Sequence, residues 1–365
     1  MNLKTLLLSS DDKTIRVLRR VLSDLEISVE HFSLSDDVIR RITRQRFEAI
    51  IVDCSDPQDA GNVLRAAKAA PVNKRALSVV LVDSQLGLKG GFDMGAHFVL
   101  HKPLAVERAK SSFRAVRALM KSERRLQLRI PVQIPVECFG SARYQAKTLD
   151  ICEGGMALRF AGRKSRESVI RFSFQLPGLD HQFEIWGEMA WEATGDQAGV
   201  RFKDLAPDQR TELRKWLDSQ LAEPVPDDPP VVCRLTDLSA AGCYLKTGTP
   251  FPASTRVILS IGSPSPADRA VGIVRITHPE FGMGVEFLQS SADQRQQVAR
   301  LIEVLRANGE SIDLLVEPNG LEPASPEEPP TSPAADALVN LFHLQLPVDD
   351  FLEQMQQHRQ LLDSR

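Results

Sequence analysis

The first third of the chain alternates short apolar runs with segments in which apolar residues recur at helical spacing. Four of the runs have the length of β-strands, and a fifth predicted strand, Ile27–Phe32, is only partly apolar. A helix that begins near Val106 ends this region. Strands that are apolar on both faces are typical of a parallel sheet covered by helices on both sides. The pattern therefore predicts a doubly wound α/β domain, and the four runs are residues 4–9, Ala49–Asp53, Ala76–Val82 and Phe98–Leu100.

Charged residues stand where these strands end. Asp11 follows the first apolar run, Asp53 ends the second, Asp83 follows the third and Lys102 follows the last. Ligands of open α/β sheets bind at the carboxyl ends of the strands. Clustered carboxylates bind a hard cation such as Mg²⁺, and a lysine neutralises phosphate oxygens. This edge of the sheet is therefore a candidate site.

This region resembles the response-regulator receiver family over about residues 3–120. The resemblance rests on Asp53 at the end of the third strand and on Lys102, which is followed by Pro103. It implies that Asp53 is the phosphoryl acceptor, that Lys102 contacts the phosphoryl group, and that Asp11 and Asp53 bind Mg²⁺.

Two positions depart from the receiver pattern. Ser10 stands beside Asp11 where the family has a pair of acidic residues, and Asp83 stands where the family has Ser or Thr. A carboxylate at Asp83 would repel a phosphoryl dianion. We therefore expect little stable phosphorylation at Asp53. The alternative is a degenerate receiver-like domain that keeps the fold and docks partners or dimerises.

The apolar period changes to two after residue 130. Apolar and polar residues alternate from Ile130 to Cys138, which predicts a half-buried strand. A helix with Leu213, Trp216 and Leu217 on one face closes the unit. Further short strands are predicted between these elements, at Met156–Phe160, Val169–Leu176, Phe183–Trp191 and Ala198–Phe202.

The β unit then recurs along the chain. Asp150–Gly155 matches Asp237–Gly242 at an offset of 87 residues, and Gly199–Phe202 matches Gly284–Phe287 at an offset of 85. Matches in the same order, with a two-residue deletion between them, indicate a tandem duplication.

Both copies resemble the PilZ family, a small six-stranded β-barrel followed by a helix. The family signature is R-x-x-x-R followed by (D/N)-x-S-x-x-G, and the resemblance covers about residues 122–220 and 230–306. The first copy keeps both halves of the signature, with a cysteine in place of the serine. The resemblance implies a cyclic di-GMP site in this copy, made of Arg125, Arg129, Asp150, Cys152 and Gly155.

These residue types suit cyclic di-GMP, which is a dianion with two purine faces. A guanidinium group is a planar, permanently charged fork that fits phosphate oxygens or the guanine edge. The carboxylate of Asp150 can accept from guanine N–H groups, and Gly155 permits a positive φ or a close approach of the backbone. A thiol is a weak hydrogen-bonding group, so Cys152 costs about 0.5–1.5 kcal/mol of binding and predicts micromolar affinity.

The second copy keeps only half of the signature. Asp237, Ser239 and Gly242 match, but the upstream segment 223–230 brings acids where the arginines should be. We therefore expect no nucleotide binding in this copy, and we expect Asp237 and Gly242 to fix a turn between two barrel strands.

The predicted architecture is multidomain: an α/β doubly wound receiver-like domain is followed by two small antiparallel β-barrels, each with a C-terminal helix. Residues 317–333 are rich in Pro, Glu and Ser, which is typical of a linker. Amphipathic helices are predicted beyond it, and these either dock a partner or fold back onto a barrel. The predicted boundaries are 1–121 for the receiver-like domain, 122–222 for the first barrel, 229–310 for the second, degenerate barrel, 317–333 for the linker and 334–365 for the helical tail.

Composition narrows the class of protein. A net charge of −3 argues against a protein that coats nucleic acid, and a hydrophobic fraction of 42% is enough to form buried cores. The apolar run near the N-terminus is too short for a signal-peptide core, and no run is long enough to span a bilayer. Five scattered cysteines without a C-x-x-C pair fit reduced thiols in the cytoplasm.

No motif for catalysis accompanies these features, because the chain has neither a zinc-protease motif, nor a phosphate loop, nor a nucleophile elbow. The sequence therefore predicts a bacterial cytoplasmic signalling effector or adaptor rather than an enzyme. Cyclic di-GMP at the first barrel would alter the domain arrangement and the contacts with protein partners, made through the receiver-like domain and the C-terminal helices. The alternative is a scaffold that binds no nucleotide, and a regulator controlled by phosphorylation is a third hypothesis.

Overall fold

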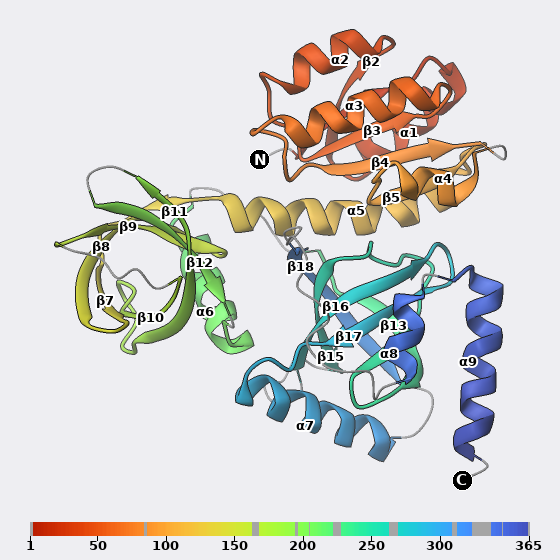
Figure 1. The fold of residues 1–365 in the computed structure, drawn as a ribbon. Helices are drawn as coiled ribbons and strands as arrows, with labels where there is room; N and C mark the ends of the chain where they lie inside the picture. Colours follow the sequence, from red (N-terminus) through yellow and green to blue (C-terminus); the bar gives the residue numbers. More distant parts are fainter. Residues whose placement is uncertain are drawn as a thin grey trace. The chain divides into compact units, whose positions relative to one another are not determined.

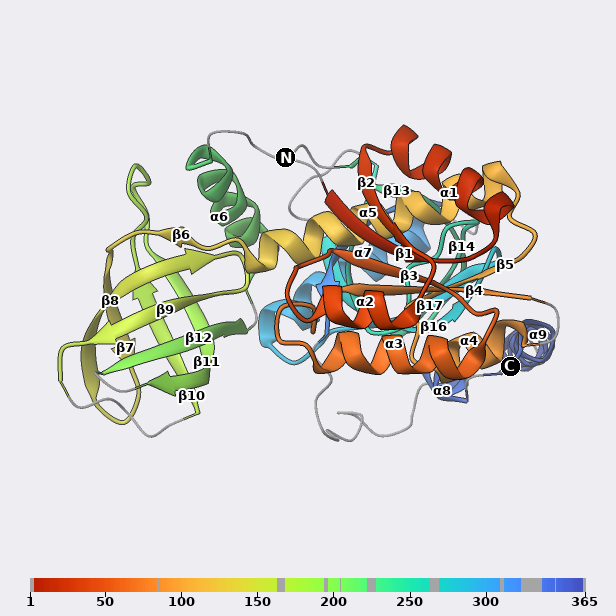
Figure 2. The same ribbon diagram turned by 90° about the horizontal axis from the view of Figure 1, so that it is seen from above.

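A computed structural model of the chain divides into two compact units (Figures 1 and 2). The composite unit consists of Met1–Glu123, Asp227–Ser290 and Gln294–Arg365, and the first-barrel unit consists of Arg124–Pro226 with Ser291–Asp293. The structure describes residues 3–83, 86–162, 168–193, 196–203, 205–221, 228–262, 269–308, 312–322, 337–344 and 346–363.

The composite unit begins with a five-stranded parallel sheet in the order β2-β1-β3-β4-β5. This is the order of doubly wound flavodoxin-like folds, and it confirms the predicted receiver-like domain. It also places the carboxyl ends of β1 and β3 side by side. The strands are β1 (Leu3–Leu8), β2 (Ile27–Phe32), β3 (Ala49–Asp53), β4 (Leu77–Val82) and β5 (Phe98–His101).

Helices cover both faces of this sheet because successive strand residues point to opposite sides. The side chains of α1 and α5 share one buried cluster with Leu3, Leu7 and Ile51, while those of α2 and α3 share another with Leu6 and Ile50. The helices of this domain are α1 (Asp12–Asp24), α2 (Ser35–Ile42), α3 (Pro57–Ala69), α4 (Gly87–Asp93) and α5 (Val106–Gln127).

The first-barrel unit is a closed antiparallel barrel in the order β8-β7-β10-β11-β12-β9, closed by the pairing of β8 with β9. The strand predicted from Ile130 to Cys138 is divided, because Pro131 and Pro135 lack the amide that a continuous ladder needs. Its first part, β6 (Ile130–Pro131), pairs only with β8. The barrel consists of β7 (Pro135–Phe139), β8 (Arg143–Cys152), β9 (Gly155–Phe160), β10 (Val169–Phe174), β11 (Phe183–Ala193) and β12 (Gln197–Lys203), followed by α6 (Pro207–Ser219).

The second barrel is also closed and six-stranded, which confirms the predicted pair of barrels. Its elements are β13 (Val231–Leu238), β14 (Gly242–Lys246), β15 (Thr255–Ile261), β16 (Arg269–His278), β17 (Gly282–Phe287), α7 (Ala292–Asn308) and β18 (Asp313–Leu321).

The strand that completes each barrel comes from opposite ends of the two repeats. In the first barrel β7 comes before the other strands and lies between β8 and β10; in the second barrel β18 comes after the helix and lies between β13 and β15. The second barrel is thus a circular permutation of the first. The predicted linker at 317–333 is therefore wrong in its first residues, because Glu317–Leu321 continue the alternating strand that buries Leu314 and Val316. Residues 323–333 of that linker lie outside the described residues.

Charged residues near the end of α5 attach this helix to the second barrel within the composite unit. Glu123 Oε2 accepts from Arg75 Nε at 2.9 Å, and Glu123 Oε1 accepts from the backbone amide of Leu321 at 2.5 Å. Asp228 Oδ1 accepts from Lys121 Nζ at 2.8 Å and from Arg117 Nη1 at 2.7 Å. Apolar side chains of α5 and of the second barrel also share one buried cluster, so the receiver-like domain and the second barrel pack as one body.

The tail forms two helices, α8 (Ala337–His343) and α9 (Val348–Asp363), and these fold back onto the second barrel (Figure 1). This is one of the two arrangements that the sequence left open. Phe342 and Phe351 are fully buried there, in a cluster with Tyr244 and Ile276. Within the described ranges, no helix combines the length and the apolar character needed to cross a membrane.

Candidate functional site

The two arginines of the predicted nucleotide site come from the end of α5 and the segment after it. Arg125 lies in the last turn of α5, where a cation interacts favourably with the helix dipole. Arg129 follows the helix, two residues after its last residue, Gln127. Both arginines therefore belong to the entry into the first barrel.

Arg129 and Asp150 form an ion pair, with Arg129 Nη1 2.5 Å from Asp150 Oδ1. Asp150 lies in β8, opposite Pro131 of β6 and Ala157 of β9. The two side chains keep 41% and 28% of their exposure, so both charges remain accessible to a ligand. The structure thus brings together two of the five predicted site residues at the barrel surface.

Gly155 stands at a close contact between two strands. A Cβ atom at this position would lie 2.1 Å from the carbonyl oxygen of Val200, which is closer than any side chain allows. Of the two reasons that the sequence offered for this glycine, the structure shows the close approach of the backbone. The hairpin that begins β9 therefore has no room for a side chain here.

Cys152 is the last residue of β8, opposite Gly155 across the turn to β9, and is only 2% exposed. Burial raises the pKa of its thiol, and the amides of Gly154 and Gly155 donate to the sulfur. In the second barrel the Oγ of Ser239 accepts from the amides of Ala241 and Gly242 at 3.3 and 3.0 Å. The residue two after the aspartate thus closes the turn in both barrels, and Cys152 does so with a weaker acceptor.

Glu153 was not predicted, although it is the most buried acid of this site at 2% exposure. Arg214 Nη2 donates to its Oε1 at 3.1 Å, Arg210 Nη1 lies 3.8 Å from the same oxygen, and Arg125 Nε lies 3.8 Å from Oε2. Burial alone would raise the pKa of Glu153, but the charges of Arg214, Arg210 and Arg125 outweigh it and hold the pKa below its ordinary value. A glutamate in a short turn usually faces solvent, so the sequence carried no signal for this cluster.

The corresponding turn of the second barrel has different surroundings. Asp237 bonds the amide of Leu238, and Ser239 Oγ donates to the carbonyl oxygen of Gly242, so these residues fix a turn as predicted. A Cβ atom at Gly242 would lie 3.1 Å from the side chain of Val339 and 3.3 Å from that of Phe342. Helix α8 therefore covers the face next to this turn.

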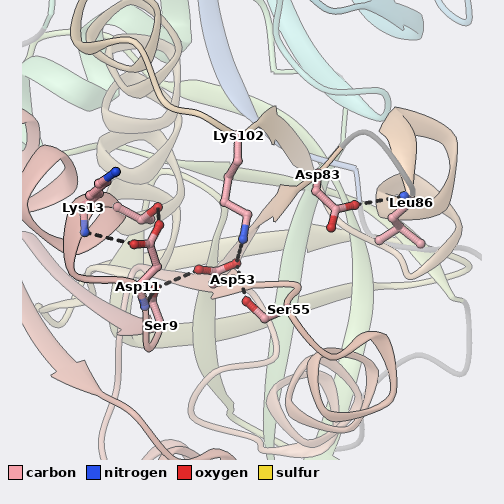
Figure 3. A network of polar contacts seen from close by, with 9 residues as sticks. Ser9, Asp11, Lys13, Asp53, Ser55, Asp83, Leu86 and Lys102 are labelled. Carbon is pink, nitrogen blue, oxygen red and sulfur yellow. Dashed lines mark hydrogen bonds and ion pairs between the residues drawn. The ribbon is translucent and has the colours of Figure 1, made fainter.

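Asp53 of the receiver-like domain is buried among donors (Figure 3). Its Oδ1 accepts from Lys102 Nζ at 2.5 Å and from Ser55 Oγ at 3.2 Å, and its Oδ2 accepts from Ser9 Oγ at 2.7 Å. The structure thus brings Asp53 and Lys102 together, as the receiver resemblance implies. Both carboxylate oxygens of Asp53 are engaged within the protein.

Asp11 and Asp83 serve the ends of helices (Figure 3). Asp11 caps α1, because its Oδ1 accepts from the amide of Lys13 at 3.0 Å and its Oδ2 accepts from Thr14 Oγ1 at 2.6 Å. These bonds, the one from Thr14 above all, hold the pKa of Asp11 below its ordinary value. Asp83 Oδ1 accepts from the amide of Leu86, just before α4.

These bonds bear on whether Mg²⁺ fits at the carboxyl ends of β1 and β3. A magnesium ion needs carboxylate oxygens that are free to enter an octahedral shell. Asp11 and Asp53 each direct their oxygens to donors of the protein, and no group of three His, Cys, Asp or Glu suited to a metal occurs among the described residues. Asp11 and Asp53 alone therefore make a poor magnesium site.

Comparison with known proteins identifies the barrels. The family model described as PilZ domain matches residues 123–219 and 220–304. No curated protein matches the chain. Among solved structures, the chain is similar to the PilZ domain of CeSA from a cellulose-synthesizing bacterium, with 20% identity and a TM-score of 0.22; the match covers 26% of this chain and 99% of that one.

Two further solved structures match the receiver-like part. The receiver domain of a sensor histidine kinase from Pseudomonas aeruginosa, whose structure has a magnesium ion in the active-site cleft, is 21% identical, with a TM-score of 0.30, over 33% of this chain and 99% of that one. The chemotaxis response regulator CheY4 of Vibrio cholerae is 19% identical, with a TM-score of 0.29, over 32% of this chain and 99% of that one.

Proposed function

We propose that this chain, a tandem PilZ-domain protein with an N-terminal receiver-like domain, is a signalling effector that binds cyclic di-GMP at its first barrel. PilZ domains are in general effector domains that bind cyclic di-GMP. The observation that carries the proposal is the accessible ion pair of Arg129 with Asp150. Arg125, the other arginine of the signature, lies 3.8 Å from Glu153, in the turn after β8.

The chemistry of this site suits a cyclic dinucleotide. Arg129 offers a partly exposed guanidinium fork to a phosphate or to the guanine edge. Asp150 can then accept from guanine N–H groups, because its carboxylate is also partly exposed. Cys152 lowers the affinity to the micromolar range, since its thiol closes the binding turn less firmly than a hydroxyl would.

The proposal assigns signal input to the first barrel and not to phosphorylation. PilZ and receiver domains are signalling domains without catalytic activity of their own. Asp53 is already held by Lys102, Ser55 and Ser9, and Asp83 adds a second carboxylate at the same edge of the sheet. A phosphoryl group on Asp53 would have to displace these contacts while facing that negative charge.

The output is proposed to pass through α5. This helix carries Phe113 in the core of the receiver-like domain and Arg125 in the nucleotide site. A ligand that captures Arg125 selects one arrangement of the helix end, and so changes the arrangement of the domains and the contacts with a protein partner. We place the protein in the bacterial cytoplasm, where cyclic di-GMP is made available to such effectors.

Calorimetric titration with cyclic di-GMP tests the proposal, with GTP as the ligand control. We expect a micromolar Kd for the wild type and a loss of about 10- to 100-fold in Arg129→Ala, since one charge-assisted contact contributes about 1.5–3 kcal/mol. Arg234→Ala is the matched control, because this exposed arginine pairs with Asp313 in the second barrel and should leave the affinity unchanged. No binding of cyclic di-GMP at about 300 μM would favour the scaffold instead.

A further inference from the structure

The carboxylate of Glu153 joins three structural elements of the first barrel. It lies in the turn between β8 and β9, while Arg125 comes from the end of α5 and Arg210 and Arg214 come from α6. Three cationic side chains thus meet at one buried carboxylate, which connects the end of α5 to α6.

The turn that carries Glu153 is fixed in place by close packing. A Cβ atom at Gly154 would lie 3.1 Å from the carbonyl oxygen of Leu126, next to Arg125. On its other side, the carbonyl oxygen of Gly154 accepts from the amide of Phe202 at 3.0 Å. Glu153 thus has a defined position, and side chains that pair with it take their positions from it.

The second barrel is an internal control for the role of this acid. With the offsets of the duplication, Ala240 takes the place of Glu153 and Ala299 takes the place of Arg214, and the arginine pair is also missing. The second barrel nevertheless connects its turn to the segment before its helix, through a bond from Gln289 Nε2 to the carbonyl oxygen of Ala240 at 3.0 Å, and Arg295 Nη1 of the helix donates to the carbonyl oxygen of Gln289 at 3.3 Å. Connecting the turn and the helix therefore needs no buried charge.

Burying an ionised acid costs desolvation free energy unless the acid is paired. We therefore expect such an acid where its charge holds another group in position. Here the acid and one of its two arginine partners on the helix are absent from the barrel that lacks the ligand arginines, while the other partner, Arg210, keeps a counterpart in Arg295. The cluster therefore goes with the nucleotide site and not with the barrel fold.

We infer that Glu153 is a positioning residue of the nucleotide site, which holds Arg125 for the ligand and connects that arginine to α6 through Arg210 and Arg214. This inference rests on the proposed function and adds an output element to it. When a phosphate takes up the charge of Arg125, the carboxylate is left to Arg210 and Arg214. Helix α6 is then held more tightly, so ligand binding is transmitted to it.

The direction in which Glu153→Gln changes the affinity separates a positioning role from simple repulsion of the ligand. A carboxylate that only repels a dianion would be unfavourable for binding, and Glu153→Gln would then tighten it. A carboxylate that positions Arg125 is favourable, and its removal weakens binding. We expect the Kd of Glu153→Gln for cyclic di-GMP to rise about tenfold by calorimetry, and that of Glu153→Asp, which keeps the charge but shortens the side chain, to rise as well.

Hydrogen exchange of the α6 amides gives a second readout that affinity alone does not provide. Saturating cyclic di-GMP should slow exchange in α6 of the wild type and leave it unchanged in Glu153→Gln. Glu137→Gln is the matched control, since this acid pairs with Arg143 on the exposed surface of the same barrel. It should keep both the wild-type affinity and the response of α6.

The outcomes separate this inference from the proposed function. If the wild type binds cyclic di-GMP and Glu153→Gln binds it equally well or more tightly, the positioning role is refuted while the proposed function stands. If Glu153→Gln does not fold, Glu153→Asp decides, and an unchanged affinity in that variant refutes the role. If the wild type does not bind at all, the proposed function fails, and the inference fails with it.

Discussion

The two barrels share one architecture down to an irregularity in one strand pair. The register between β11 and β12 shifts between Met189 and Trp191, and that between β16 and β17 shifts between Val274 and Ile276, at positions that are 85 residues apart. The shift brings Trp191 opposite Gly199 in the first barrel and Ile276 opposite Gly284 in the second. The residues around this shift therefore form equivalent faces of the two barrels.

This face is buried in the second barrel and partly exposed in the first. In the second barrel Phe342 of α8 packs onto Gly284, and Ile276 is only 4% exposed. In the first barrel Trp191 lies over Gly199 and remains 44% exposed. One copy thus covers the face with a helix of its own chain, whereas the other leaves the side chain of Trp191 partly exposed there.

The charges at the entrances of the barrels are also opposite. Arginines precede the first barrel, and one of them pairs with Asp150 at the surface. An acid, Asp228, precedes the second barrel and pairs with Arg117 and Lys121 of α5. The two copies of one fold therefore differ in the charge at their entrance and in a covering helix, and under the proposed function these two differences separate a ligand site from a structural support.

Uncovering the second barrel should have the largest effect. Phe342→Ala removes a fully buried aromatic side chain, so we expect a loss of about 3–5 kcal/mol in the packing of the tail, seen as faster hydrogen exchange in α8 and α9. Leu344→Ala, at a side chain that is 59% exposed, is the control. The uncovered barrel should still bind no cyclic di-GMP by calorimetry, and binding there would show that covering alone had silenced it.

Acidification should lower the stability of the first barrel by protonating Glu153, which pairs there with three arginines. The second barrel has no counterpart of this acid. The pKa of Glu153 is lower in the folded protein than its ordinary value near 4.3, so its stabilisation is present above that value and is lost as the pH falls through the lower, folded pKa. All three tryptophans, Trp186, Trp191 and Trp216, lie in this barrel, and their fluorescence therefore follows its urea unfolding.

The wild type should be more stable than Glu153→Gln at pH 7 by about 1.5–3 kcal/mol, the usual worth of a hydrogen bond to a charged group. The difference should shrink toward zero below about pH 4. A difference that does not change with pH would mean that the ionised carboxylate is not what stabilises the barrel.

Exchanging the turn residues of the two barrels should have the smallest effect. Cys152→Ser gives the first turn the hydroxyl that Ser239 gives the second, and we expect cyclic di-GMP to bind about 2- to 13-fold more tightly. Ser239→Cys, the reciprocal variant, should cost the second barrel about 0.5–1.5 kcal/mol of unfolding free energy and leave the affinity unchanged. Equal affinities of the wild type and Cys152→Ser would separate the turn from the ligand.

The parts of the fold that were predicted are those with a local signal. The strands around Asp53 are apolar on both faces, and the motif that contains Asp150 recurs at a fixed offset, so the sheet and the barrels could be inferred without coordinates. Strand β18 could not, because its proline and acids resemble a linker and its place in the barrel depends on strands that are distant in sequence.

The predicted site was incomplete for the same reason. Arg129 and Asp150 belong to one sequence motif, which placed them in one site, but their ion pair with each other was not predicted. The partners of Glu153 on α6 come more than 50 residues later, and no local pattern connects them to the turn. Contacts between segments distant in sequence, and not residue types, set the limit of the sequence analysis.

The ion pair of Lys121 with Asp228 has a consequence for the modularity of the chain. These residues lie just outside the two ends of the segment Arg124–Pro226, and Lys121 Nζ is 2.8 Å from Asp228 Oδ1. The chain therefore leaves and rejoins the composite unit at neighbouring residues, the geometry in which the insertion of a whole domain is tolerated. Because Arg125, Asp150 and Glu153 all lie inside this segment, the proposed function implies that exchanging the segment exchanges ligand binding while the composite unit keeps its own fold.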